Sequence, residues 1–150
     1  MKMIDSKIST ASVHQKIKEA ESITDVLKEF NSNNMREITL KDYLNRMLYK
    51  KGLIVADVVR GSGVKKQYVH QIFNGDRKHP SRDVLLAIAF GLHLDESETQ
   101  KMLCLGGCSK LYAKDSRDAI IIFCLDNGYS LSKTDDILYD NDRPTISPKS

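Results

Sequence analysis

Apolar residues recur along most of the chain at spacings of three and four, and strict alternation of apolar and polar residues is scarce. Side chains at the first spacing share one face of an α-helix, whereas a half-buried strand shows a period of two. The N-terminal part gives a clear example, because Ile23, Val26, Leu27 and Phe30 form the stripe of an amphipathic helix over 13–30. We therefore expect an all-α protein.

Capping residues and glycines predict where the shorter helices begin and end. Thr39 and Ser81 each precede an apolar pattern and can accept a hydrogen bond from a backbone N–H of the first turn. Gly52 and Gly106 lie just past the end of such a pattern. The residues Gly61-Ser62-Gly63 are predicted to form a sharp turn. The helices predicted in this way span 40–50, 55–60, 65–74, 84–90 and 96–105.

Two segments in the second half of the chain resemble each other. SRDVLLAIAF at 81–90 aligns with SRDAIIIFCL at 116–125, an offset of 35 residues, and three further identities follow at the same offset. The match reflects either an internal duplication or the general likeness of two capped apolar helices. Both explanations predict a helical hairpin in the C-terminal third. Because that hairpin lacks the basic loop and lysines of the first half, we expect it to be a packing or partner surface.

These patterns divide the chain into three parts. They are an N-terminal arm with its amphipathic helix over 1–35, a central helical domain over 36–107, and a C-terminal helical extension with a loose tail over 108–150. No apolar run approaches the ~20 residues that span a membrane, so we expect no membrane partner. The start, MKMIDSKIST, does not resemble a secretory signal, and the three cysteines form no secreted-type framework. A cytoplasmic location is the expectation.

Charge is distributed unevenly although the net value is only +3. Between positions 41 and 82 there are ten lysines and arginines against three aspartates, which is a net charge of +7. A basic middle flanked by neutral or acidic segments is typical of a nucleic-acid-binding unit within a larger fold. A solvated surface without a partner would show the same pattern, so charge alone does not decide.

Residues 62–75, SGVKKQYVHQIFNG, place basic and amide side chains opposite an apolar face. Two short helices meet at the turn that contains Gly63, and the second helix presents its N-terminal end and one face outward. Amide and ammonium groups there suit base edges in a major groove, and a helix N-terminus can receive a phosphate. Basic residues just after the helix can reach the DNA backbone. The candidate DNA-binding residues are Lys65, Lys66, Gln67, His70, Gln71, Asn74, Arg77 and Lys78.

The central part resembles the phage-repressor-like helix-turn-helix proteins of the Cro/CI or Xre type. The motifs that carry the resemblance are KKGL at 50–53, SGV at 62–64, the helix pattern that ends at Gly75, R-K-x-P-S at 77–81, and LLAIAFGLHLDESE at 85–98. The resemblance implies a five-helix DNA-binding core, here with an N-terminal helix and a C-terminal hairpin. It also implies a bacterial or phage-type transcriptional regulator that binds double-stranded DNA. Because one small module makes few contacts, a homodimer that reads two half-sites is a further expectation, and the C-terminal hairpin either supports the core or forms that dimer. By position, it assigns Lys65, Lys66, Gln67 and His70 to the groove and Asn74, Arg77 and Lys78 to phosphates.

Three positions depart from the family's pattern. Ile54 stands where a Ser or Thr usually caps the first helix of the motif, Val55 replaces a Gln that often touches the DNA backbone, and Val59 replaces a common Ala. A lost cap typically costs ~1 kcal/mol. The apolar pair Ile54-Val55 also suggests a contact for another protein segment, and the C-terminal hairpin is one candidate cover. The alternative function is therefore a protein-interaction module of the antitoxin or adaptor type, with a protein partner bound through that hairpin.

Other chemistry finds little support in the sequence. Cys104 and Cys108 have a C-x₃-C spacing without a second pair, which suits neither a structural zinc site nor a disulfide framework. Gly61 and Gly63 do not match a phosphate-binding loop of the G-x₄-G-K-[ST] type. No nucleophile motif is present. We expect no enzymatic activity, no cofactor and no metal.

Overall fold

The structure is a computed structural model of the whole chain, which describes residues 15, 18, 22–24 and 38–147. The chain forms two units, Met1–Ile38 and Thr39–Ser150. Most of the predicted helix over 13–30 lies outside the described residues. The account that follows concerns the second unit, which contains most of the predicted central domain and the whole of the predicted C-terminal extension.

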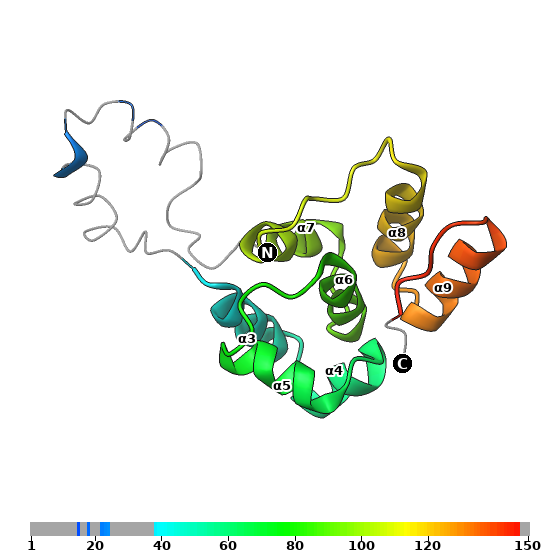
Figure 1. Cartoon of the computed structure of the whole chain (residues 1–150), viewed down its shortest axis with the longest axis horizontal. Helices are drawn as coiled ribbons and strands as arrows, with labels where there is room; N and C mark the ends of the chain where they lie inside the picture. The colour runs from blue at the N-terminus through cyan, green and yellow to red at the C-terminus, as the bar shows by residue number, and fades with distance from the viewer. Residues whose placement is uncertain (1–14, 16–17, 19–21, 25–37, 148–150) are drawn as a thin grey trace. The chain divides into compact units, whose positions relative to one another are not determined.

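Residues 38–147 contain seven α-helices and no strand, which confirms the all-α expectation (Figure 1). The predicted C-terminal hairpin is present as the last two helices. The helices are α3 (Leu40–Lys50), α4 (Val55–Ser62), α5 (Lys66–Asn74), α6 (Arg82–Gly91), α7 (Glu96–Leu105), α8 (Ser116–Asp126) and α9 (Leu131–Asp140).

The predicted caps are present. Thr39 Oγ1 accepts a hydrogen bond from the N–H of Asp42 at 3.1 Å, and Ser81 Oγ accepts one from the N–H of Val84 at 3.3 Å. The three-residue turn predicted at 61–63 is wrong in part, because α4 continues through Ser62. Gly63 alone makes the turn, with φ of 70°. The buried Ser62 hydroxyl accepts a hydrogen bond from the N–H of Val64 at 3.1 Å and stabilises it.

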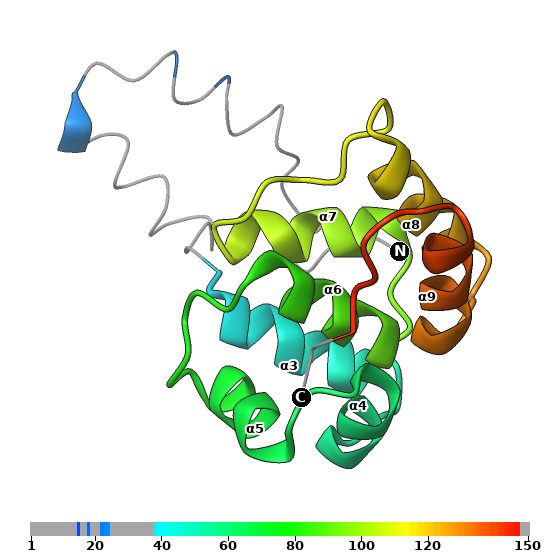
Figure 2. The same cartoon turned by 45° about the vertical axis from the view of Figure 1, so that its right-hand side comes forward.

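The core is built around α6, which runs through the middle of the unit (Figure 2). Its side chains from Leu85 to Phe90 are buried, and α6 packs against α4, α7 and α9. The backbones of α4 and α6 approach closely because glycines lie at their crossing. A Cβ atom placed on Gly61 would lie 3.0 Å from the Cα of Gly91. Gly61 therefore serves helix packing and not the turn to which the sequence pattern assigned it.

The hairpin α8–α9 repeats the hairpin α6–α7 at the offset of 35 residues seen in the sequence. The two inter-helix turns each contain one residue with positive φ, His93 at 57° and Gly128 at 69°. The same holds after the second helices, at Gly107 with 75° and Asp142 with 58°. Equivalent residues therefore adopt the same uncommon backbone conformation, including two that are not glycine.

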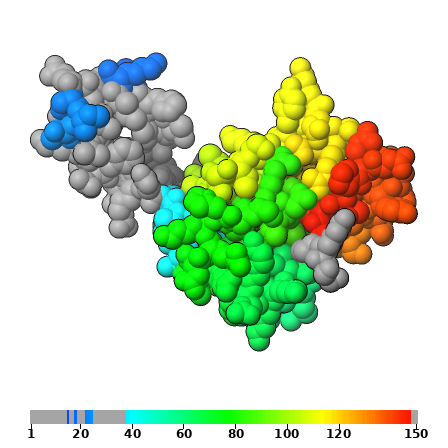
Figure 3. Space-filling view, viewed as in Figure 1, coloured from blue at the N-terminus to red at the C-terminus, as the bar shows by residue number. Residues whose placement is uncertain are grey.

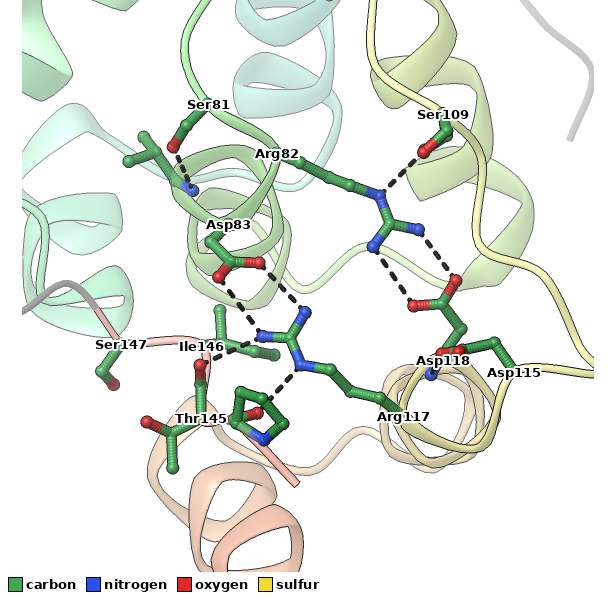
Figure 4. Close-up of polar contacts among 12 residues, drawn as sticks. Ser81, Arg82, Asp83, Ser109, Asp115, Arg117, Asp118, Thr145, Ile146 and Ser147 are labelled. Atoms are coloured by element: carbon green, nitrogen blue, oxygen red, sulfur yellow. Dashed lines mark hydrogen bonds and ion pairs between the residues drawn. The ribbon is translucent and has the colours of Figure 1, made fainter. Parts of the chain in front are cut away.

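The two hairpins are joined by a reciprocal exchange of ion pairs (Figure 4). The guanidinium of Arg82 in α6 donates to both carboxylate oxygens of Asp118 in α8, at 3.2 and 2.9 Å. The guanidinium of Arg117 in α8 donates to both carboxylate oxygens of Asp83 in α6, at 3.2 and 3.3 Å. Because each hairpin offers the same two residues to the other, the contact resembles that between the halves of a two-fold dimer.

The same two arginines also hold the segment that follows their own hairpin. Arg82 donates to the carbonyls of Ser109 and Lys110, at 3.0 and 3.1 Å. Arg117 donates to the carbonyls of Pro144 and Thr145, at 2.9 and 3.0 Å. These acceptors are again 35 residues apart. The resemblance between the segments therefore extends to tertiary contacts, beyond the general likeness of two capped helices.

Acid stability is expected to depend on Glu98, which joins α7 to α3. Burial by itself raises the pKa of this carboxyl. The N–H of Asp95 and the ammonium of Lys51 lower it by more than burial raises it, so the pKa lies below its ordinary value of 4.5. The stabilisation is therefore present above that value and is lost as the pH falls through the folded-state pKa. We expect Glu98→Gln to reduce the dependence of unfolding free energy on pH below about 4.5. Urea unfolding at a series of pH values measures this, and equal dependence in both proteins would contradict it.

Candidate nucleic-acid interface

Helix α5 is anchored by one face and exposed on the other. Val69, Ile72 and Phe73 are buried against the core. The amide of Asn45 in α3 donates to the carbonyl of Phe73 at 2.8 Å and so ties the end of α5 to α3. The helix is therefore held rigidly while its other face remains available to a ligand.

The predicted DNA-binding residues lie mainly on that exposed face and in the following loop. In Figure 3 the surface of α5 and of this loop (green) lies toward the viewer. Gln71 differs from the others because it is half-buried. The exposed residues are Lys65, Lys66, Gln67, His70, Asn74, Arg77 and Lys78.

Arg77 does not extend freely from its loop. Its guanidinium lies over the ring of Tyr68, with Cζ 4.3 Å from the ring centroid. Its Nε donates to Oε1 of Gln71 at 2.9 Å, and its backbone N–H donates to the carbonyl of Gln71 at 3.0 Å. Gln71 therefore positions Arg77, and its amide oxygen is already occupied. The two terminal nitrogens of the guanidinium make no hydrogen bond within the described part of the chain.

Two further residues belong to this surface although the sequence pattern did not select them. Tyr68 is half-buried. The sequence could have indicated it, because an aromatic residue three positions before Gln71 lies on the same side of α5 as Gln71. Lys41 is exposed on the first turn of α3 and lies beside Gly75, where an added Cβ would be 3.1 Å from its Cδ. Only the packing of α3 against α5 brings this lysine beside the end of α5.

The start of α4 compensates for its missing cap in another way. Ile54 has no side-chain acceptor, but the carboxylate of Asp57 accepts a hydrogen bond from the Ile54 N–H at 2.9 Å. Asp57 also forms an ion pair with Arg60. The side chain of Ile54 is 63% exposed. The C-terminal hairpin therefore does not cover Ile54, since α9 packs on α6 and α8 on α7, although the neighbouring Val55 is half-buried.

The described residues contain no group of three or more His, Cys, Asp or Glu side chains that would hold a metal ion. Cys104 is exposed, Cys108 is half-buried and Cys124 is buried, and all three are free thiols. Burial raises the pKa of the Cys124 thiol. Among the described helices none is long and apolar enough to cross a membrane.

Comparison with known proteins adds no relative. No family model, curated protein or solved structure matches the chain.

Proposed function

We propose that this protein is a sequence-specific DNA-binding transcriptional regulator that inserts α5 into the major groove of double-stranded DNA. The observation that carries the proposal is the corner formed by α4 and α5. It holds one face of α5 in the core and leaves Lys66, Gln67 and His70 exposed on the other. In this proposal α3–α7 correspond to the five-helix repressor-like core, and Gln67 and the lysines contact base edges.

The loop after α5 supports the same proposal. Arg77 is held in place by Tyr68 and Gln71 before any ligand binds, so little side-chain freedom is lost when a phosphate is bound. Lys78 and Lys41 are both exposed near the C-terminal end of α5, Lys78 in the following loop and Lys41 beside Gly75, where they can contact the DNA backbone. A single module of this size makes few contacts, and two copies that read two half-sites provide more.

Binding to duplex DNA across a salt series tests the proposal. We expect tight binding to DNA from upstream of the protein's own gene, weaker binding to a random duplex of equal length, and a steep decrease with salt. Lys78→Ala should weaken binding to both duplexes and reduce the salt slope by about 1. Gln67→Ala should mainly reduce the preference between them, by about 1–3 kcal/mol.

Lys114→Ala is the matched control, because Lys114 is an exposed lysine in the loop before α8 and far along the chain from α5. It should leave both affinities unchanged. Weak binding that is equal on both duplexes and insensitive to Lys78→Ala would reject the proposal.

A second candidate function rests on Ile54. An apolar side chain that is 63% exposed at the start of α4 suits a contact with another protein, and the DNA-contacting Gln of the family is absent from the next position. A protein-interaction module on a helix-turn-helix scaffold, of the antitoxin or adaptor type, is the corresponding function. In that case Ile54→Ser would abolish partner binding and the α5 variants would not.

A further inference from the structure

The internal repeat allows the two hairpins to be compared face by face. On α7, Glu98 and Met102 form an edge that is covered by α3. The carboxylate of Glu98 pairs with Lys51 at 2.9 Å and Lys50 at 3.4 Å, and the Tyr43 hydroxyl donates to the Glu98 carbonyl at 2.9 Å. Met102 is fully buried. A helix with complementary charge therefore covers this edge in the first hairpin.

The equivalent edge of the second hairpin is open. At the offset of 35 residues, Glu98 and Met102 correspond to Lys133 and Ile137 of α9. Lys133 is exposed and Ile137 is only half-buried. Asp140 is exposed one turn beyond Ile137. Within residues 38–147 no ion pair engages the Lys133 ammonium or the Asp140 carboxylate.

Aromatic side chains extend this edge onto α8. The Lys133 ammonium lies 3.9 Å from the centroid of the Tyr129 ring. Tyr129 contacts Phe123 edge to face, with the ring centroids 5.9 Å apart, and Phe123 is 56% exposed. We call this surface, made of Phe123, Tyr129, Lys133, Ile137 and Asp140, the α9 face.

The charges of the α9 face are complementary to those of a second copy. Lys133 and Asp140 are seven residues apart, which is about two turns or ~10 Å along one side of α9. Two α9 helices that pack antiparallel about a two-fold axis near Ile137 would place each Lys133 beside the Asp140 of the other. The two Ile137 side chains would meet between these ion pairs.

We propose that the α9 face is a homodimer interface, in which α9 of one copy packs antiparallel against α9 of the second. The occupant takes the place on α9 that α3 takes on α7, with the charges supplied by the second copy. Figures 1 and 2 both show α9 at a different edge of the unit from α5, so this contact leaves α5 exposed in both copies. This interface deepens the proposed function, because a dimer presents two α5 helices to two half-sites on DNA. Only this role in DNA binding rests on the proposed function.

Charge reversal tests the interface. Sedimentation velocity of the full chain over a range of concentrations, without DNA, should show a dimer that dissociates on dilution. Lys133→Glu places a glutamate beside Asp140 of the second copy, and Asp140→Lys places a lysine beside its Lys133. Each single variant should weaken dimerisation by at least tenfold, since both ion pairs become repulsive. The double variant Lys133→Glu with Asp140→Lys should restore the dimer, because both pairs are re-formed with reversed charge.

Lys114→Glu is the matched control for a change of two charges at an exposed lysine, and it should leave dimerisation unchanged. A wild-type chain that is monomeric at all concentrations, single variants that dimerise normally, or a double variant that stays as weak as the singles would each overturn the interface. The outcome is independent of DNA binding. A monomer that binds its upstream DNA would support the proposed function and reject the interface. A dimer that passes the charge-reversal test but does not bind DNA would support the interface and reject the proposed function.

Discussion

Asp118→Asn should lower the free energy of unfolding by about 2–4 kcal/mol, whereas Asp83→Asn should lower it by less than about 1 kcal/mol. The two aspartates are equivalent in the internal repeat and each binds one arginine through both carboxylate oxygens. They differ in burial, because the Asp118 side chain is 8% exposed and that of Asp83 is 49% exposed. The same substitution therefore probes the same contact in a dry and in a solvated setting.

The larger effect at Asp118 has a physical cause in the groups left behind. Its carboxylate also accepts a hydrogen bond from the N–H of Tyr112 at 2.9 Å. Burial by itself raises the pKa of Asp118. Arg82 and the Tyr112 N–H lower it by more than burial raises it, so the pKa in the folded protein lies below the usual value. Asn has an NH₂ group in place of one carboxylate oxygen, so at this buried position either the Tyr112 N–H or one nitrogen of the Arg82 guanidinium would lose its acceptor.

Urea unfolding of both variants at neutral pH and 25 °C measures the difference, with the unsubstituted protein as the reference. Equal losses for the two variants would mean that the two ion pairs are equally solvated in solution, and would contradict the burial described here. The lowered pKa of Asp118 adds a second readout. Its stabilisation is lost as the pH falls through the folded-state pKa, so Asp118→Asn should be less sensitive to acid than the unchanged protein.

Gly91→Ala should lower the free energy of unfolding by about 2 kcal/mol although alanine favours helices. The added Cβ would lie 2.9 Å from the carbonyl oxygen of Val58 and 3.2 Å from the backbone nitrogen of Ser62. Both atoms belong to the backbone of α4, so relief requires that α4 and α6 move apart. The intrinsic gain of about 1 kcal/mol from replacing a helical glycine offsets only part of this cost.

Ser132→Ala is the control for helix propensity, because Ser132 is exposed on α9. It should change stability by no more than about 0.5 kcal/mol. Thermal and urea unfolding of both variants provide the measurement. A Gly91→Ala protein that is as stable as the unchanged chain, or more stable, would show that the crossing of α4 and α6 is looser than in the structure.

The sequence by itself predicted the helices of the second unit because the signals involved are local. A cap acts on a backbone N–H three residues away, as at Thr39 and Ser81, and an apolar stripe repeats within a few turns. The offset of 35 residues was also visible, since equivalent residues keep the same type in both hairpins. The candidate DNA-binding residues could be chosen for the same reason, because one helix and its following loop carry nearly all of them.

Tertiary structure alone decided what several of these residues do. Gly61 was assigned to a turn by its neighbours in sequence, but the approach of α6, thirty residues further along, makes it a packing residue. Arg77 was predicted to contact phosphate, and its placement against Tyr68 and Gln71 emerged only when the loop folded back on α5. Lys41 reached the surface of α5 through the packing of α3.

The exchange of ion pairs between the two hairpins shows most clearly what could not be predicted from the sequence. The sequence displays Arg82-Asp83 and Arg117-Asp118 as two equal pairs of adjacent residues, with no indication that each arginine binds the aspartate of the other pair. Adjacent side chains on a helix do not face each other, so the partners had to come from elsewhere in the chain. Packing of one hairpin on the other supplied them. The same packing determined that the Asp118 side chain is buried whereas that of Asp83 is about half exposed, because burial depends on which other segments of the fold pack against a residue.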